Sequence, residues 1–121
     1  MQKEASLFKV LSDPTRLRLV SLLLFKGETC VCVLAQALNE RDFKISRHLG
    51  VMRSAGLVEA KRVGTWMYYK VVEPRTLFEQ YLQEFLRKSL ADHQTLKQDL
   101  MNMSAAISCV DLRNDNEKKG I

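Results

Sequence analysis

A short polar turn, Asn39-Glu40-Arg41, separates two helix-forming segments and constrains the fold of this chain more than any other feature. We expect Thr29 to cap a short helix through Leu38 before the turn. After it, we expect Asp42 to cap a second helix through Ala55, with Gly56 as a left-handed stop. Two short helices joined by a tight turn are typical of a helix-turn-helix.

The segments around this pair predict the rest of the fold. Upstream, Asp13-Pro14 suits the start of a buried helix, because proline has no N–H group to leave unpaired. Downstream, residues 57–63 and 65–72 are rich in β-branched and aromatic side chains, and Gly64 lies at the bend between them, which predicts a hairpin. Pro74 then opens an amphipathic helix that we expect to continue to about Met103.

We therefore predict a mainly α protein with a small β-hairpin, a winged helix-turn-helix. At 121 residues the chain is long enough for one domain. We place that domain at residues 1–108, and we expect residues 109–121 to form a polar, flexible tail.

Composition indicates the kind of partner, the cellular location and the state of the cysteines. The net charge is +5 at pH 7, which favours a polyanionic partner but is weak evidence alone. No apolar run is long enough to span a membrane, and the first residues carry no signal-peptide pattern, so we expect a cytoplasmic protein. Three cysteines, an odd number, are then expected to be reduced thiols.

The helix after the turn has a core face and a polar face. At 100° per residue, Ile45, Leu49 and Met52 cluster on one side, with His48 at the margin as a core-edge residue. The other side and the hairpin tip supply the candidate DNA-binding residues: Phe43, Lys44, Ser46, Arg47, Ser54, Lys61 and Arg62. Arginine can fork onto a guanine edge, lysine and serine can hold phosphates, and phenylalanine can touch a thymine methyl group. The alternative is an ordinary solvated basic face.

Cys30 and Cys32 form the candidate metal site. Soft thiolates select soft metal ions over Mg²⁺ or Ca²⁺. Residues two apart on a regular helix point about 200° from each other. The two thiols can therefore meet on one ion only if the backbone around Val31 departs from a regular helix.

The last helix carries a longer apolar stripe than a domain of this size can cover. Pairing two copies of the chain would cover it and would present two reading helices to a two-fold symmetric operator. We expect a homodimer built on the first and last helices, with contacts from Leu7, Phe8, Leu11, Tyr81, Leu82, Phe85 and Leu86. The alternative is that the stripe packs on its own domain.

Five runs of residues also carry a family resemblance: Ser12-Asp13-Pro14-Thr15-Arg16-Leu17-Arg18-Leu19, Cys30-Val31-Cys32, Lys44-Ile45-Ser46-Arg47-His48-Leu49, Arg53-Ser54-Ala55-Gly56-Leu57-Val58 and Gly64-Thr65-Trp66-Met67-Tyr68-Tyr69. In order and spacing they resemble the ArsR/SmtB family of metalloregulatory repressors, and within it the arsenic-responsive repressors. The resemblance implies a homodimer that holds double-stranded operator DNA and releases it when As(III) or Sb(III) binds. It also implies that the first and last helices make the dimer contact. We expect no catalytic cofactor.

The sequence departs from the arsenic-responsive pattern at one position. Several of these repressors carry a third cysteine where this chain has Ala35. A third sulfur would therefore have to come from Cys109, the other thiol in the chain, or the ion keeps an oxygen ligand. Related zinc and cobalt sensors use Asp and His residues of the last helix. Here His93 has no second His–Glu pair a few turns on, and we expect it to be an interface residue on the apolar stripe.

Other functions remain open. The Cys30–Cys32 pair could sense oxidation instead of an ion. It could also bind cadmium or lead, or it could be inert in a plain DNA-binding module. The sequence contains no nucleophile–base constellation, phosphate-binding glycine loop or paired carboxylates, so we do not expect an enzyme.

Overall fold

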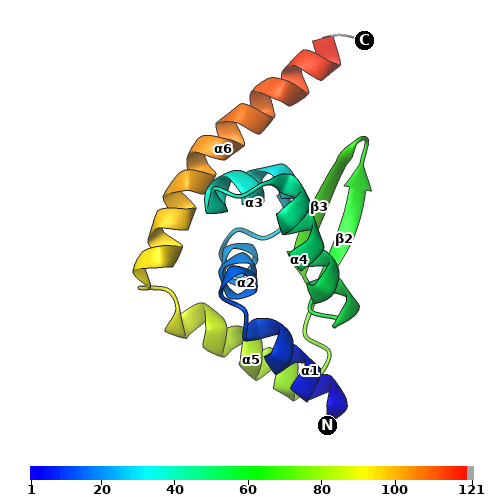
Figure 1. Cartoon of the computed structure of the whole chain (residues 1–121), viewed down its shortest axis with the longest axis vertical. Helices are drawn as coiled ribbons and strands as arrows, with labels where there is room; N and C mark the ends of the chain where they lie inside the picture. Colours follow the sequence, from blue (N-terminus) through cyan, green and yellow to red (C-terminus); the bar gives the residue numbers. More distant parts are fainter. Residues whose placement is uncertain (120–121) are drawn as a thin grey trace.

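A computed structural model of the chain describes the backbone of residues 1–119 and the side chains of residues 1–106. Helices α1 (Gln2–Leu11) and α2 (Pro14–Lys26) are followed by strand β1 (Thr29–Cys30) and helices α3 (Val31–Leu38) and α4 (Asp42–Ser54). Strands β2 (Val58–Val63) and β3 (Trp66–Val71) form a hairpin, and helices α5 (Leu77–Ser89) and α6 (Gln94–Lys119) follow (Figure 1). Helices α3 and α4 form the predicted helix-turn-helix.

The helix boundaries follow local chemistry. The Asp13 carboxylate accepts a hydrogen bond from the Arg16 backbone N–H at 3.0 Å and caps α2, with Pro14 in the first turn. Asn39 ends α3 in the left-handed conformation that Asn tolerates. At the next boundary, Arg41 occupies the N-cap position of α4, so Asp42 lies inside the first turn instead of capping it.

The hairpin prediction is confirmed and the sheet is larger than expected. Strands β2 and β3 pair antiparallel, with Val63 opposite Trp66 across the bend and Gly64 at a φ of +63°. Strand β1 adds a third, antiparallel strand beside β3, in which Cys30 pairs with Tyr68. The expected cap at Thr29 is therefore wrong. Thr29 lies in strand β1, and its hydroxyl donates a hydrogen bond to the Gly27 carbonyl at 2.9 Å.

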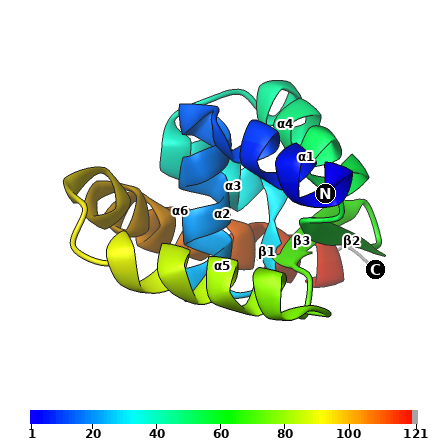
Figure 2. The ribbon, with the colours of Figure 1, turned by 90° about the horizontal axis from the view of Figure 1, so that it is seen from below.

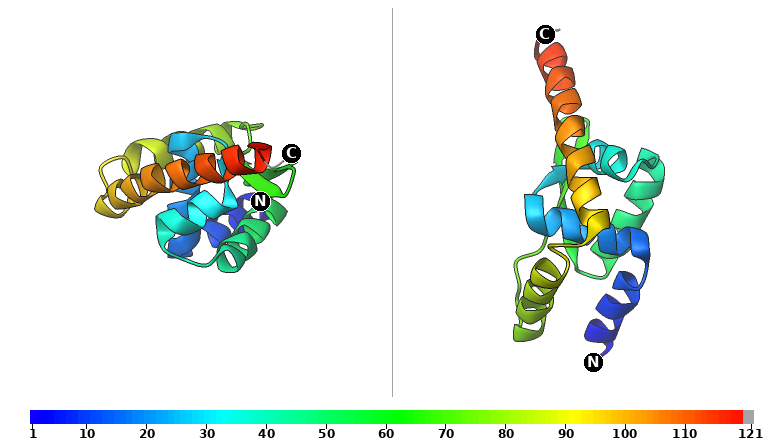
Figure 3. Two further views of the ribbon diagram at one scale, coloured as in Figure 1. Left: turned by 90° about the horizontal axis from the view of Figure 1, so that it is seen from above. Right: turned by 90° about the vertical axis from the view of Figure 1, so that its left-hand side faces the viewer.

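The single long helix expected after Pro74 is also wrong. The chain turns between Ser89 and Gln94, and α5 and α6 leave the turn in different directions (Figures 1 and 3). His93 starts the second helix, because its Nδ1 accepts the Thr95 N–H at 3.1 Å and its carbonyl accepts the Lys97 N–H. The turn leaves His93 exposed instead of on an apolar stripe.

The two helices on either side of this turn pack against different parts of the molecule. Helix α5 lies with α1 at one end of the molecule (Figures 2 and 3), and α6 packs along α2 and α3. The buried face of α6 carries Leu96, Asp99, Met103 and Ala106. Helix α6 continues to Lys119, so residues 109–119, which were expected to form a flexible tail, are helical. The side chain of Cys109 lies outside the described residues.

The core lies between α2, α3, α4 and the sheet. Leu19, Leu22, Leu34, Ile45, Leu49 and Met52 are completely buried there. Burying each of these side chains contributes on the order of 2 kcal/mol to the free energy of folding. Among the described residues, no helix is both long and apolar enough to cross a bilayer.

Candidate metal centre and nucleic-acid interface

The structure brings the two neighbouring thiols together. The Sγ atoms of Cys30 and Cys32 lie 3.3 Å apart, and the residues are only 3% and 4% exposed. Cys30 ends strand β1 with φ −70° and ψ 143°, and Cys32 lies in the first turn of α3. The extended backbone at Cys30 removes the 200° separation that a regular helix would impose.

This pair can bind one soft ion or form a disulfide. The two cysteines form no disulfide with each other, because their sulfur separation is well beyond the roughly 2.05 Å of an S–S bond. Within the part of the chain whose side chains are described, no three His, Cys, Asp or Glu residues are grouped to hold a metal ion. The described side chains therefore provide two sulfur ligands, and Ala35 is buried where a third cysteine would lie.

The surroundings tie the thiols to the helix-turn-helix. Strand β1 fixes Cys30 against β3, and α3 packs on both α4 and α6. At the far end of α3, the Asn102 side chain of α6 donates a hydrogen bond to the Ala37 carbonyl at 3.0 Å. A change in the first turn of α3 would therefore act on α4, the helix that follows the turn, and on α6.

Helix α4 has the two faces that its sequence predicts. Ile45, Leu49 and Met52 are completely buried, whereas Phe43 is 70% exposed. The Arg47 guanidinium carbon lies 5.4 Å from the centre of the Phe43 ring, a cation–π arrangement. His48 is half-buried at the core edge, with its Nδ1 4.0 Å from Asp13 Oδ2.

The other candidate DNA-binding residues lie on the same helix or on the hairpin beside it (Figure 1). Ser46, Ser54, Lys61 and Arg62 are exposed. Two basic side chains already have partners: Lys44 Nζ lies 3.0 Å from Glu40 Oε1, and Arg62 Nε donates to the Gly64 carbonyl at 3.3 Å. Binding a phosphate through either side chain would compete with these contacts.

The residues predicted for the dimer contact fall into two groups. Leu7, Leu11 and Leu86 are buried within the chain, and Leu82 is half-buried. Phe8, Tyr81 and Phe85 are more than half exposed, as is Leu77, which was not among the predicted contacts. The four-residue spacing from Leu77 to Tyr81 to Phe85 is the sequence signal that places Leu77 on the same face. The Phe8 ring also packs edge-to-face on Phe78, with 5.6 Å between the ring centres, and so joins α1 to α5.

One ion pair, in which only the carboxylate is buried, has no local sequence signal. Arg18 of α2 donates from Nε and Nη2 to both carboxylate oxygens of Asp99 in α6, at 2.9 and 2.8 Å. The hydrogen bonds that Arg18 donates to Asp99 raise the pKa of Arg18 above its ordinary value, although burial acts in the opposite direction. The pair fixes α6 to α2 across a large separation in sequence.

Helices α3 and α4 with the hairpin define a winged helix-turn-helix transcriptional regulator. The family model of the bacterial regulatory proteins of the arsR family matches residues 13–60. An uncharacterized HTH-type transcriptional regulator of Methanocaldococcus jannaschii is 40% identical over 74 residues, which are 61% of this chain and 83% of that protein. The chain belongs to the ArsR family of DNA-binding transcriptional regulators.

Two further similarities bear on the function. The arsenical resistance operon repressor of Escherichia coli is 48% identical over 65 residues, 54% of this chain and 56% of the repressor. The chain thus spans little more than half of that relative. A homodimeric winged helix-turn-helix DNA-binding domain from Mycobacterium bovis, a possible ArsR-family regulator, is 30% identical with a TM-score of 0.61. The match covers 77% of this chain and 86% of that one.

Proposed function

We propose that this chain is an operator-binding repressor that releases DNA when As(III) or Sb(III) binds Cys30 and Cys32. The observation that carries the proposal is the 3.3 Å separation of two buried cysteine sulfurs beside the helix-turn-helix. The similarity to an arsenical resistance operon repressor supports the choice of ion. The inducer is a soft ion that two thiolates can bind.

The proposed coupling runs through α3. Drawing both sulfurs onto one ion changes the junction between β1 and the first turn of α3, where Cys30 is extended and Cys32 is helical. Because α3 packs on α4, that change moves the DNA-reading helix relative to the rest of the chain. Inducer and operator then favour different conformations, so each lowers the affinity for the other by the same factor.

The DNA interface that we propose consists of the exposed face of α4 and the hairpin. Arg47 and Phe43 would face the bases, and the other basic and hydroxyl side chains would hold phosphates: Lys44, Ser46, Ser54, Lys61 and Arg62. In a two-fold dimer the two α4 helices would enter successive turns of the major groove.

We assign the dimer contact to the exposed apolar face formed by Phe8 of α1 and by Leu77, Tyr81 and Phe85 of α5. The homodimeric relative from M. bovis supports this oligomeric state. Replacing Phe85 with lysine would place a charge in the contact and should shift the chain from dimer to monomer in light scattering. Arg87→Ala, exposed on the same helix but about 120° around it from the centre of this face, is the control.

The experiment that tests the inducer is fluorescence anisotropy of DNA from the chain's own upstream promoter, titrated with arsenite. A phosphine reductant must be used, because a dithiol reductant would itself bind As(III). We expect arsenite to release the wild type and to leave the Cys30→Ser/Cys32→Ser variant bound. Unchanged binding of the wild type would discard the arsenic mechanism, and cadmium and lead salts in parallel arms would test the other soft ions.

A third ligand is tested in the same assay. Cys109→Ser should weaken the response to arsenite if this thiol binds the ion from its own or the partner subunit. An unchanged response would make Cys109 a spectator, and the two thiols would then hold the ion with an oxygen ligand.

The same short sulfur separation favours a second candidate function, a dithiol redox switch. Hydrogen peroxide would oxidise the two thiols to one disulfide and be reduced to two water molecules, taking up both thiol protons and both electrons. Release of DNA by peroxide, reversed by reductant and insensitive to arsenite, would support this function over the first.

A further inference from the structure

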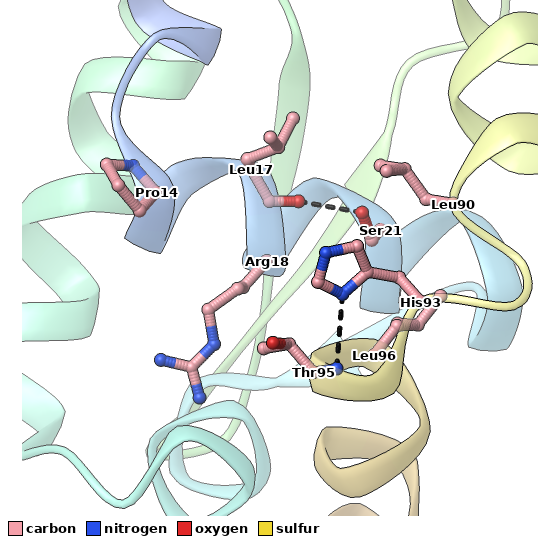
Figure 4. A pocket seen from close by; sticks show the side chains of 8 residues that line it. All are labelled: Pro14, Leu17, Arg18, Ser21, Leu90, His93, Thr95 and Leu96. Carbon is pink, nitrogen blue, oxygen red and sulfur yellow. Dashed lines mark hydrogen bonds between the residues drawn. The ribbon is translucent and has the colours of Figure 1, made fainter.

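A pocket of about 220 Å³ lies where the turn between α5 and α6 meets α2 (Figure 4). Its apolar walls are Pro14 and Leu17 of α2, Leu90 in the turn and Leu96 of α6. A cavity of about 150 Å³ holds a benzene ring, so this pocket has room for a six-membered ring with a small polar group. Neither Cys30 nor Cys32 lines it, so it is separate from the candidate metal centre.

The polar groups at the pocket are mainly hydrogen-bond donors. Arg18 has five N–H donors, and two of them bind Asp99, which leaves three for another acceptor. The Nδ1 atom of His93 accepts the Thr95 N–H, so the neutral ring carries its proton on Nε2 and can donate from there. The Ser21 hydroxyl already donates to the Leu17 carbonyl.

We propose that this pocket binds a small cyclic monocarboxylate of about the size of benzoate. The ring would lie against the apolar walls, and the carboxylate would accept hydrogen bonds from Arg18 and His93. Such charge-assisted bonds are the strong ones, and a planar guanidinium suits a carboxylate. An uncharged ring would lose these bonds, which makes the carboxylate the distinguishing group.

The place of the pocket gives its occupant an effect on the regulator. Arg18 holds α6 through Asp99, and α6 in turn holds α3 through Asn102 and the Ala37 carbonyl. A carboxylate bound to Arg18 therefore acts through α6 on α3, the helix that also links the thiol pair to α4. The pocket is an effector site independent of Cys30 and Cys32, and its ligand should bind the Cys30→Ser/Cys32→Ser variant equally well.

The test is titration of the isotope-labelled full chain with benzoate, followed by amide chemical shifts and calorimetry. We expect saturable binding at one site per chain, with the largest shifts at His93, Thr95 and Leu96. His93→Ala should weaken binding about tenfold, the effect of one lost hydrogen bond to a charged group. Leu90→Trp should fill the pocket and abolish binding, and Lys97→Ala, exposed on α6 outside the pocket, should change nothing.

Any of three results with the wild-type chain would overturn the proposal. They are no saturable binding of benzoate, shifts that centre on another part of the chain, or equal affinity for the neutral analogue benzamide. Retained binding by Leu90→Trp, with a native spectrum, would also place the ligand elsewhere. None of these results depends on DNA or arsenite, so the pocket can fail while the proposed repressor function stands.

Discussion

Arg18 and Asp99 form an ion pair with two hydrogen bonds, in which the two side chains differ sharply in exposure to solvent. The Asp99 residue is 1% exposed, whereas the Arg18 side chain is 34% exposed. Removing the arginine therefore leaves a buried carboxylate without its partner, while removing the carboxylate leaves a cation that water can reach. The two halves of one interaction should have unequal effects on stability.

We predict that Arg18→Met lowers the free energy of unfolding by roughly 3–5 kcal/mol, the usual cost of leaving a buried charge unpaired. Asp99→Asn should cost less, because the amide keeps the shape of the carboxylate and Arg18 can turn toward solvent. Urea unfolding at one fixed chain concentration measures both, since the stability of a dimer depends on concentration. Equal losses in the two variants would contradict the asymmetry.

The N-cap of α2 should make stability depend on pH. Partial burial alone would raise the pKa of Asp13, but the Arg16 N–H and the charge of His48 outweigh it and lower the pKa below its ordinary value. A carboxylate with a lowered pKa in the folded state stabilises the fold above its unfolded pKa of about 3.9. That contribution is lost as the pH falls through the folded pKa.

Asp13→Ala should therefore cost about 1 kcal/mol at pH 7, the usual value for a lost cap. Asp13→Ser keeps a capping oxygen without a titrating group. The stability advantage of the wild type over Asp13→Ser should shrink between pH 5 and pH 3 in urea unfolding, as the Asp13 carboxylate takes up its proton. A constant difference over this range would show that the Asp13 charge contributes nothing to stability.

The sequence predicted those features of the fold that depend on a few neighbouring residues. The turn at Asn39 and the hairpin bend at Gly64 depend on residues that tolerate positive φ, and both lie where expected. The buried face of α4 follows from helical spacing alone. The condition for the thiols to meet, an irregular backbone around Val31, could also be stated from sequence, because it follows from helix geometry.

Other features depend on contacts that are distant in sequence. Strand β1 has two residues and exists because Cys30 pairs with Tyr68. The break between α5 and α6 contains no proline or glycine, and the apolar spacing continues across it. Helix α6 turns away because its buried face packs on α2 and α3, where Arg18 meets Asp99. No sequence pattern within α6 predicts that Asp99 pairs with Arg18.

Gly50 gives a test of the proposed reading face. It lies in the middle of α4, and a Cβ atom built there meets no described atom within 4 Å. Gly50→Ala should therefore stabilise the helix by up to about 1 kcal/mol, measured by urea unfolding. If DNA approaches this face closely, the same methyl group should weaken promoter binding in the anisotropy assay. Greater stability with unchanged DNA affinity would exclude close approach at this point.

Phe43 and Arg47 give the sharpest test of how α4 would read DNA. The exposed Phe43 ring lies under the Arg47 guanidinium, so we predict that it holds this side chain ready for a base edge. An exposed cation–π contact contributes about 0.5–1 kcal/mol. Phe43→Ala should then weaken specific binding by roughly two- to fivefold per half-site, with little change for unrelated DNA. Phe43→Trp, which keeps the aromatic face, should retain specific binding.

A double-mutant cycle separates this role from a direct contact between Phe43 and a thymine methyl group. If the ring acts through Arg47, Phe43→Ala should have almost no further effect once Arg47 is replaced by alanine, because the interaction is already lost. If the ring contacts DNA by itself, the two losses in binding free energy should add. Anisotropy titrations of the four proteins on promoter DNA, at one salt concentration, give the coupling energy, and a value near zero would rule out the positioning role.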